Sequence, residues 1–214
     1  MTKPNQPTPK VDDPHHEKKE YKIDVVNGII PTPDQFVGPY YPAGEKPVDG
    51  GNDMSHLPGR EPASGEVISV FGKVVNLHDE PCPDVKIEIW QSNARGKYIH
   101  RNDHNPVPID PNFDGYANIV TDSKGHYRFK TVMPASYPVT PEFWRPPHIH
   151  YDIVGRVNRL VTQMYFPDEP LNDKDPILQV AWFNESLIAK VVPPSPNDES
   201  GIKQFEWDII LIEG

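Results

Sequence analysis

Apolar and polar positions begin to alternate at Val67, and short alternating segments continue from there towards the end of the chain. Residues 67–75 form one predicted strand, and residues 85–90 show the period of two that is typical of a half-buried strand. The turn residues at 122–125 (DSKG) indicate a hairpin between residues 119–121 and 126–132. Further strands are predicted at residues 147–154, 159–166, 178–183 and 204–212, the last of which would close the sheet, and residues 173–178 indicate a short helix.

Many short strands joined by turn-rich links predict an all-β fold with a two-sheet β-sandwich core and extended loops. Residues 66–214 form this predicted domain. Residues 1–20 lack large apolar side chains apart from Met1 and Val11, which predicts a flexible tail. Residues 21–65 are rich in proline and glycine, with scattered apolar residues, which predicts an arm that packs on the core or on a neighbouring subunit.

Composition narrows the class of protein. The 214 residues suit one domain of moderate size, and the 27 prolines fall mostly between apolar runs, which favours a loop-rich β protein over disorder. A formal net charge of −10 argues against binding to nucleic acid or to an anionic membrane. No apolar run approaches the ~20 residues of a membrane helix. The single cysteine, Cys82, allows no internal disulfide, and the N-terminus does not resemble a signal peptide, so we expect a cytoplasmic protein.

Two histidines lie two residues apart in the predicted strand at 147–154. Side chains at positions i and i+2 of a strand point to the same side. His148 and His150 can therefore offer two imidazoles to one metal ion, which could be zinc, copper or iron. The other adjacent pair, His15 and His16, is predicted to be solvated in the tail.

Tyr98 and Tyr137 would narrow the choice of metal. A phenol is a weak ligand until a strongly charged cation deprotonates it, so a site of tyrosines and histidines indicates Fe(III). Sets with cysteine or carboxylate ligands would indicate Zn(II) or Fe(II) instead. Taken singly, Tyr137 could equally cap the core from its turn, and Tyr98 could stack beside Trp90.

Two polar residues near the histidine pair have alternative interpretations. Arg145 either forms a surface ion pair or faces an anionic substrate and stabilises developing negative charge. Gln163 interrupts an otherwise apolar predicted strand and needs a hydrogen-bond partner, which is either a core hydroxyl or a substrate.

Taken in order, these motifs resemble the intradiol ring-cleavage dioxygenases over roughly residues 36–212, and most of all the iron-bearing subunit of the family's two-chain members. The ordered set is more specific than any single fragment of it. The motifs are residues 38–41 (GPYY), 87–94 (IEIWQSNA), 96–98 (GKY), 110–113 (DPNF), 121–127 (TDSKGHY), 137–138 (YP), 144–150 (WRPPHIH) and 162–166 (TQMYF).

The resemblance implies cleavage of the ring of a catechol-type (1,2-dihydroxy) aromatic by O2 to a cis,cis-muconate-type dicarboxylate. It implies one non-haem Fe(III) per chain, with the ligands Tyr98, Tyr137, His148 and His150. It implies that substrate displaces Tyr137, and that Arg145 stabilises negative charge on the ring. The implied catalytic residues are Arg145, Gln163 and Tyr137, and the implied pocket residues are Gly38, Pro39, Tyr40, Trp90 and Val139.

The chain departs from the family's reference member at Val139, where that member has an indole. Loss of a large pocket wall predicts a wider pocket and a substrate preference altered from protocatechuate. The reference enzyme also combines two homologous chains, and its catalytic pocket borrows residues from the chain without iron. Here we expect a homo-oligomer in which the arm around Gly38 supplies that wall, or else a second homologous subunit.

Two other functions remain open at this point. Residues 72–132 also resemble transthyretin-like β-sandwich modules that bind without catalysis. A zinc or copper hydrolase could use His148 and His150, but it would leave the tyrosines unexplained. The combination of two tyrosines with the histidine pair favours the ring-cleaving enzyme.

Overall fold

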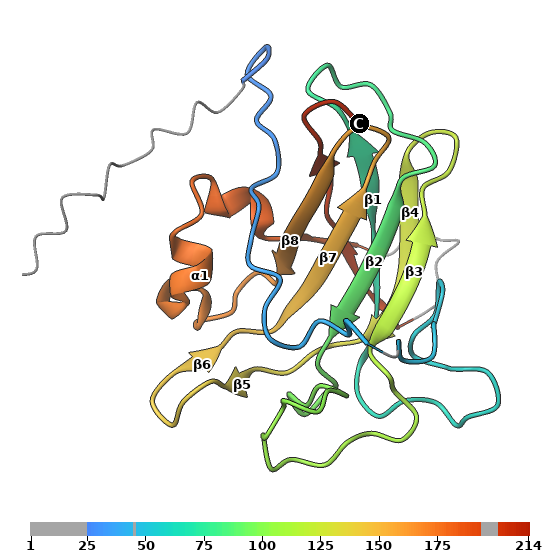
Figure 1. Ribbon diagram of the computed structural model, residues 1–214, viewed down its shortest axis with the longest axis vertical. Coiled ribbons are helices and arrows are strands. Elements are labelled where there is room, and N and C mark those ends of the chain that lie inside the picture. The colour runs from blue at the N-terminus through green and yellow to red at the C-terminus, as the bar shows by residue number, and fades with distance from the viewer. Residues whose placement is uncertain (1–24, 45, 194–200) are drawn as a thin grey trace, which may run out of the picture.

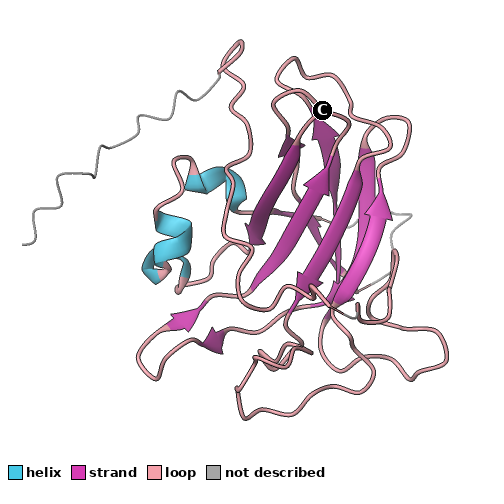
Figure 2. Cartoon of the chain, viewed as in Figure 1, coloured by secondary structure: helices cyan, strands magenta, loops and turns pink. Residues whose placement is uncertain are grey.

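The computed structural model describes residues 25–44, 46–193 and 201–214, which form two β-sheets packed face to face (Figure 1, Figure 2). In the first sheet, β1 pairs antiparallel with β4 and parallel with β10 and β11, and β9 follows β10. The second sheet has the order β3-β2-β7-β8, and β5 and β6 form a separate two-stranded ribbon. The strands of the first sheet are β1 (Val67–Val75), β4 (His126–Val132), β9 (Lys190–Val192), β10 (Lys203–Glu206) and β11 (Ile209–Ile210). The others are β2 (Lys86–Gln91), β3 (Tyr116–Val120), β5 (Tyr137–Pro138), β6 (Trp144–Arg145), β7 (His148–Val154) and β8 (Arg159–Tyr165).

The helical part of the described chain is short. It consists of the 3₁₀ helix η1 (Asn172–Lys174), the helix α1 (Pro176–Gln179) and the 3₁₀ helix η2 (Asn184–Leu187), all at one side of the second sheet (Figure 2). Asp175 begins α1, because its side chain accepts a hydrogen bond from the backbone N–H of Ile177 and Pro176 occupies the first helical position. None of the described helices is long and apolar enough to cross a membrane.

The hydrophobic core lies between the two sheets. Ile68 and Val70 of β1 face Ile149, Tyr151 and Ile153 of β7, and all of them are fully buried. Alternate residues of a strand point to opposite faces, so these apolar positions leave the polar positions of β7 on the other side of its sheet. The predicted all-β, two-sheet sandwich is confirmed.

A second buried cluster covers the outer face of the β3-β2-β7-β8 sheet. It consists of aromatic residues: Trp90, Tyr98, Tyr116 and Tyr137, with Tyr40 and Tyr41 packed against them. The blue segment of Figure 1, which precedes β1, descends along the β8 edge of this sheet and crosses the lower ends of its strands. This face therefore carries a second, polar and aromatic interior.

Backbone hydrogen bonds fix residues 25–65 to both sheets. Thr32 N–H donates to the carbonyl oxygen of Ile210 at 2.9 Å, and Gln35 N–H donates to that of Val161 at 2.8 Å. Further along, Met54 N–H donates to the carbonyl oxygen of Lys130 at 2.9 Å. The division of the chain into a tail, an arm and a sandwich domain stays a prediction, and the tail with His15 and His16 lies outside the described residues.

Three predictions differ from the structure: one strand, one hairpin and the continuity of the last strand. Residues 178–183 do not form a strand, because the Asp175-Pro176 pair starts a helix and the apolar run continues it into a turn. The turn at 122–125 does not close a hairpin, although Asp122 Oδ1 accepts from the N–H groups of Lys124 and His126. The strands on either side of this turn join different sheets, β3 with β2 and β4 with β1. The predicted strand at 204–212 is interrupted between β10 and β11, where Asp208 Oδ1 accepts from Lys73 N–H.

Candidate active site

The candidate site lies on the outer face of the second sheet, where side chains of β2, β7 and β8 meet. His150 of β7 pairs in register with Trp90 of β2 and with Gln163 of β8. His148 pairs with Tyr165 of β8. Strand alternation therefore groups these five side chains on the face opposite the sandwich core, and all five are buried.

His148 and His150 face each other through their Nε2 atoms, which lie 3.2 Å apart. His148 Nδ1 lies 2.7 Å from the carbonyl oxygen of Pro146. Because a carbonyl only accepts, Nδ1 carries the proton and Nε2 presents a lone pair. Burial, and then the charge of Arg145, hold the pKa of both imidazoles well below its ordinary value. Both rings are therefore neutral, which is the form that binds a metal.

The ring of His150 is held by packing. It stacks on Trp90 with the ring centroids 4.8 Å apart and the planes 8° apart. Gly38 lies beside the same ring, where an added Cβ would come within 3.2 Å of His150 Cε1. Gly38 also has a φ of +75°. This position needs glycine both for its backbone conformation and for its close approach to His150.

Tyr98 follows β2 in a loop that buried side chains hold in place. Its backbone N–H donates to Asp103 Oδ2 at 2.7 Å. Asn93 Oδ1 accepts from the N–H groups of Arg95 and Lys97 at 2.8 and 3.1 Å. Such bonds from Asn and Asp side chains to the nearby backbone are typical of tight turns. They position the Tyr98 phenol against the outer face of the sheet.

Tyr137 lies in β5, in register with Arg145 of β6. The residue before it, Ser136, approaches the loop of Tyr98, because a Cβ added at Gly96 would clash with the carbonyl oxygen of Ser136. Gly96 has a φ of +77°. Glycine at this position allows the two tyrosine-bearing segments to meet.

The two phenols approach each other and the two imidazoles. The rings of Tyr98 and Tyr137 meet edge to face, with centroids 5.4 Å apart. The ring of Tyr137 lies 5.6 Å from that of His148, and the ring of Tyr98 lies 6.2 Å from that of His150. Burial raises the pKa of both phenols, although the charge of Arg145 opposes this rise. The Tyr98 hydroxyl is buried and has no hydrogen-bond partner among the described residues.

Arg145 lies beside the histidines in a buried network. Its Nε and Nη2 donate to Asp175 Oδ2 at 3.1 and 2.7 Å. Nη2 also donates to Gln163 Oε1 at 2.9 Å and to the Tyr165 hydroxyl at 2.7 Å. Nη1 lies 3.3 Å from His148 Nε2. Arg145 is therefore not a surface ion-pair residue, and its partners are fixed on one edge of the guanidinium.

Gln163 connects Arg145 to the chain segment before β1. Its Oε1 accepts from Arg145 and from the Tyr165 hydroxyl, and its Nε2 donates to the carbonyl oxygen of Phe36 at 2.8 Å. Both polar side-chain atoms of Gln163, Oε1 and Nε2, therefore have a protein partner.

The remaining predicted pocket residues lie around the edge of the cluster. Tyr40 packs on Tyr98 with centroids 4.6 Å apart and lies 5.8 Å from the ring of Tyr137. Pro39 is exposed. Val139 is 52% exposed, in the turn that follows Tyr137. The structure therefore brings Tyr40 into the cluster and leaves Pro39 and Val139 at the surface.

Sequence reasoning missed Asp175, Tyr165 and Asp103. Asp175 and Tyr165 hold Arg145, and Asp103 holds the backbone of Tyr98. Residues 173–178 indicated a short helix, but no local pattern indicated that Asp175 has a partner 30 residues away in sequence. Such pairs become visible only when the fold brings β6 next to the start of α1.

The donor set fits a metal ion. Across the described ranges, no group of three or more His, Cys, Asp and Glu side chains could hold a metal. A metal here would therefore need the phenol oxygens of Tyr98 and Tyr137 in addition to the two imidazoles. An apolar core gives no reason for a buried hydroxyl without a partner beside two facing imidazole nitrogens, whereas a cation would satisfy all of them.

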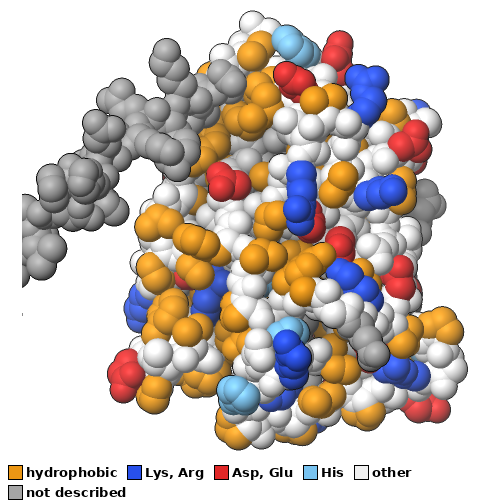
Figure 3. Space-filling view, in the orientation of Figure 1, with side chains coloured by type: hydrophobic (Ala, Val, Ile, Leu, Met, Phe, Trp, Pro, Cys, Tyr) orange, Lys and Arg blue, Asp and Glu red, His pale blue; other side chains and the backbone are white. Residues whose placement is uncertain are grey.

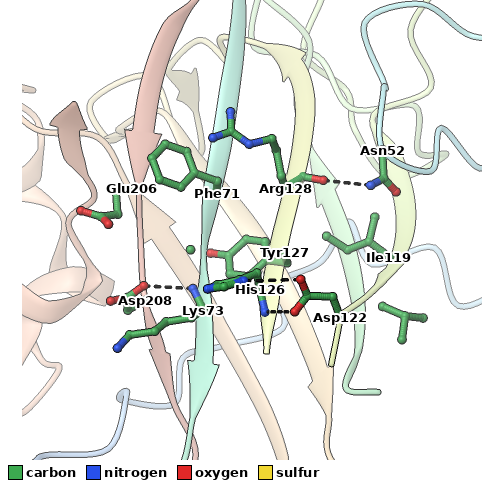
Figure 4. A pocket seen from close by; sticks show the side chains of 12 residues that line it. Asn52, Phe71, Lys73, Ile119, Asp122, His126, Tyr127, Arg128, Glu206 and Asp208 are labelled. Carbon is green, nitrogen blue, oxygen red and sulfur yellow. Dashed lines mark hydrogen bonds and ion pairs between the residues drawn. The ribbon is translucent and has the colours of Figure 1, made fainter. Parts of the chain in front are cut away.

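Two surface pockets of about 520 and 630 Å³ lie elsewhere. The first lies on the outer face of the first sheet, between Phe71, Lys73 and Arg128 (Figure 4). Several of its polar groups are paired with each other, as the bonds of Asp208 and Asp122 in Figure 4 show. Tyr98, Tyr137, His148 and His150 together form what we call the tyrosine–histidine cluster. None of these four residues lines either pocket.

The chain is similar in sequence to known proteins. The sequence family described as Dioxygenase matches residues 36–213. The chain is 38% identical to the protocatechuate 3,4-dioxygenase beta chain of Burkholderia cepacia over 184 residues, which cover 83% of this chain and 77% of that one. It is 31% identical to the catechol 1,2-dioxygenase of Acinetobacter baylyi over 158 residues, which cover 67% of this chain and 49% of that enzyme.

The fold also resembles a solved structure. The 3-chlorocatechol 1,2-dioxygenase of Rhodococcus opacus 1CP superposes with a TM-score of 0.67 at 23% identity, over 86% of this chain and 73% of that one. At this level of identity the likeness concerns the fold alone.

Proposed function

The chain belongs to the intradiol ring-cleaving dioxygenases, and on that premise we propose that it opens the ring of a catechol-type (1,2-dihydroxy) aromatic with O2, giving a cis,cis-muconate-type dicarboxylate. The observation that carries the proposal is the convergence of two facing imidazole nitrogens and two phenols in one buried cluster. The names of the relatives, protocatechuate 3,4-dioxygenase and catechol 1,2-dioxygenase, support a substrate of this class.

The proposed cofactor is one non-haem Fe(III), held by the side chains of Tyr98, Tyr137, His148 and His150. Phenolate oxygen suits a hard, highly charged cation, and neutral imidazole suits iron as well. When bound, such an ion lowers the pKa of phenol and catechol hydroxyls and activates the chelated aromatic towards O2.

Tyr137 is the base that we propose for a substrate hydroxyl. Burial raises the pKa of its phenol, so that its phenolate binds a proton strongly, while the charge of Arg145 opposes this rise. Its position in the short β5–β6 ribbon, rather than in the main sheet, would let it move when substrate binds.

Arg145 would stabilise negative charge on the bound ring. It is 4% exposed and permanently charged, and its Nη1 lies beside His148 Nε2. Gln163 contributes by holding Arg145 and the backbone of Phe36, because its own polar atoms are already paired.

Gly38, Tyr40 and Trp90 would form the pocket wall. The cavity that borders Tyr40, Trp90 and Tyr98 measures only about 10 Å³, far less than a catechol needs. We therefore expect the segment around Tyr40, or the ribbon with Tyr137, to shift on substrate binding. Val139, which is 52% exposed beside Tyr137, would alter the substrate preference from protocatechuate.

The two alternative functions are not favoured. A transthyretin-like binding module gives no reason for the buried tyrosine–histidine cluster. A zinc or copper hydrolase would need a carboxylate or third histidine near His148 and His150, and the described residues contain no such group.

We also propose a homo-oligomer, with a second homologous subunit as the alternative. Val180, Trp182 and Phe183 are 70%, 40% and 37% exposed just after α1. In Figure 3, apolar side chains gather over the region that α1 occupies in Figure 1. Exposed apolar surface of this kind is typical of subunit contacts. The buried, unpaired Cys82 is in keeping with a cytoplasmic location.

Iron loading and oxygen uptake test the proposed function. The iron-loaded protein should be burgundy-red through tyrosinate-to-Fe(III) charge transfer, and an oxygen electrode should record uptake with catechol, protocatechuate, hydroxyquinol, gallate, or a chlorinated or methylated catechol. A chelator should abolish both signals, and Fe(III) but not Zn(II) should restore them. A colourless iron-loaded sample would refute the proposed site.

A further inference from the structure

The buried carboxylate of Asp175 is the charged partner of Arg145. Asp175 is 0% exposed, and its Oδ2 accepts from both Nε and Nη2 of Arg145. A buried ion pair costs desolvation energy and is weak evidence for stability, so its presence beside a reactive cluster calls for another explanation.

The geometry gives that explanation. Nε and Nη2 of Arg145 are bonded to Asp175, and Nη2 also reaches Gln163 and Tyr165. The remaining group, Nη1, lies 3.3 Å from His148 Nε2. Because a guanidinium is planar and rigid, fixing one edge fixes the direction of the other.

Asp175 is itself held by the chain around it. Its Oδ1 accepts from Ile177 N–H at 3.0 Å, and its carbonyl oxygen accepts from Gln179 N–H at 2.9 Å. The start of α1 therefore anchors the carboxylate. An asparagine would cap the helix equally well, so the cap does not account for the negative charge.

We infer that Asp175 is a positioning residue, which fixes the guanidinium of Arg145 with its Nη1 edge turned towards the tyrosine–histidine cluster. The inference rests on the proposed function, in which Arg145 stabilises negative charge on the substrate. Among the described residues no hydrogen bond joins Asp175 to His148, His150, Tyr98 or Tyr137, and it acts through Arg145.

The test is Asp175→Asn, which keeps the helix cap and removes the charge. We expect kcat to fall about tenfold to a hundredfold, as displaced catalytic groups commonly cause, with KM changed less than threefold. Asp152→Asn is the matched control. It removes another buried carboxylate bonded to an arginine, in this case the exposed Arg159 of β8, and we expect it to leave kcat unchanged.

Two further measurements separate positioning from a general structural role. In an Arg145→Lys background, Asp175→Asn should cause no further loss of kcat, because lysine has no guanidinium for Asp175 to orient. In a crystal structure of metal-free Asp175→Asn, the guanidinium should be rotated away from its position in the wild type. An unchanged guanidinium, or an unchanged kcat, would overturn the inference.

The crystallographic measurement also separates the two proposals. If no catechol is cleaved by the wild type, the proposed function fails, while the orientation of Arg145 in the metal-free variant still decides the role of Asp175. If Arg145→Lys loses activity and Asp175→Asn does not, the positioning role alone is wrong.

Discussion

Tyr98 and Tyr127 are both buried, but their hydroxyls have opposite surroundings. The Tyr98 hydroxyl has no hydrogen-bond partner among the described residues, whereas the Tyr127 hydroxyl donates to the carbonyl oxygen of Trp207 at 2.6 Å. A buried polar group without a partner lowers stability, so its retention at Tyr98 points to a ligand.

Replacing these two hydroxyls should give opposite results. Tyr98→Phe should weaken the charge-transfer colour to the contribution of Tyr137 and abolish oxygen uptake with a catechol, without lowering the free energy of unfolding of the metal-free protein. Tyr127→Phe should lower that free energy by about 1 kcal/mol and leave oxygen uptake intact. Urea unfolding and an oxygen electrode measure both. Full activity in Tyr98→Phe would remove this residue from the site.

Val139 also belongs to the scale of single residues, because it is an exposed side chain in the turn that follows Tyr137 and Pro138. Val139→Trp should add a wall and shift the ratio of kcat/KM values among ring-substituted catechols by about tenfold, a range within which one large contact discriminates. The measurement is oxygen uptake across the substrate panel. The same order of preference in both proteins would show that position 139 does not contact the substrate.

How far single residues could be predicted depended on the range of their interactions. The spacing of His148 and His150 places them on one face of a strand, and the structure has them facing each other. The tyrosines joined them only through a resemblance over the whole motif set. The pairing of Asp175 with Arg145 could not be predicted from the sequence, because that contact depends on how the chain after β8 returns to β6.

At the scale of elements, the site depends on two loops that approach each other closely. Gly96 and Ser136 are in contact where the loop of Tyr98 meets the ribbon of Tyr137. Gly59 has the same φ of +77°, but an added Cβ there would meet no atom within 4 Å. An alanine at Gly59 would therefore cause backbone strain alone, whereas an alanine at Gly96 would cause the same strain and also a clash with Ser136.

Gly96→Ala should bleach the charge-transfer colour and lower oxygen uptake at least tenfold, because the Tyr98 loop must move away from Tyr137. Gly59→Ala should cost a similar backbone strain, about 1 kcal/mol, and leave the colour unchanged. Absorbance of the iron-loaded proteins decides between them. Equal colour in both variants would show that the loops need not touch.

The same scale shows why some elements were predictable. The strands at 67–75 and 126–132 match β1 and β4, because alternation and flanking turns define both. Residues 178–183 are apolar except for Gln179, and a short apolar run fits a helix or a strand equally well. The β5–β6 ribbon, with two residues in each strand, has too few positions to show a period.

At the scale of the whole molecule, the free energy of unfolding should fall at alkaline pH, and the Tyr127 phenol should contribute to that fall. Burial raises the pKa of this phenol well above its ordinary value of about 10. A pKa raised by folding contributes stability that is complete below about pH 10 and is lost as pH rises towards the folded value. The free energy of unfolding should therefore fall between pH 9 and pH 11, by up to about 1.4 kcal/mol per pH unit for this phenol.

Tyr127→Phe should show a shallower fall over the same interval, because it removes one of the protons that only the unfolded chain releases. Urea unfolding of the metal-free proteins at both pH values gives the comparison. An equal fall in the two proteins would assign the pH dependence to other groups.

The bonds between Thr32 and Ile210 also bear on the order of assembly during synthesis. Both the N–H and the hydroxyl of Thr32 bond to the backbone of Ile210, 178 positions later in the chain. During synthesis, Tyr98, Tyr137 and both histidines are added to the chain well before β11, which contains Ile210. The segment that brings Gly38 beside His150 thus lacks one of its anchors in the nascent chain, and a chain that stalls before Ile209 would present its imidazoles and phenols with that cover incompletely fastened.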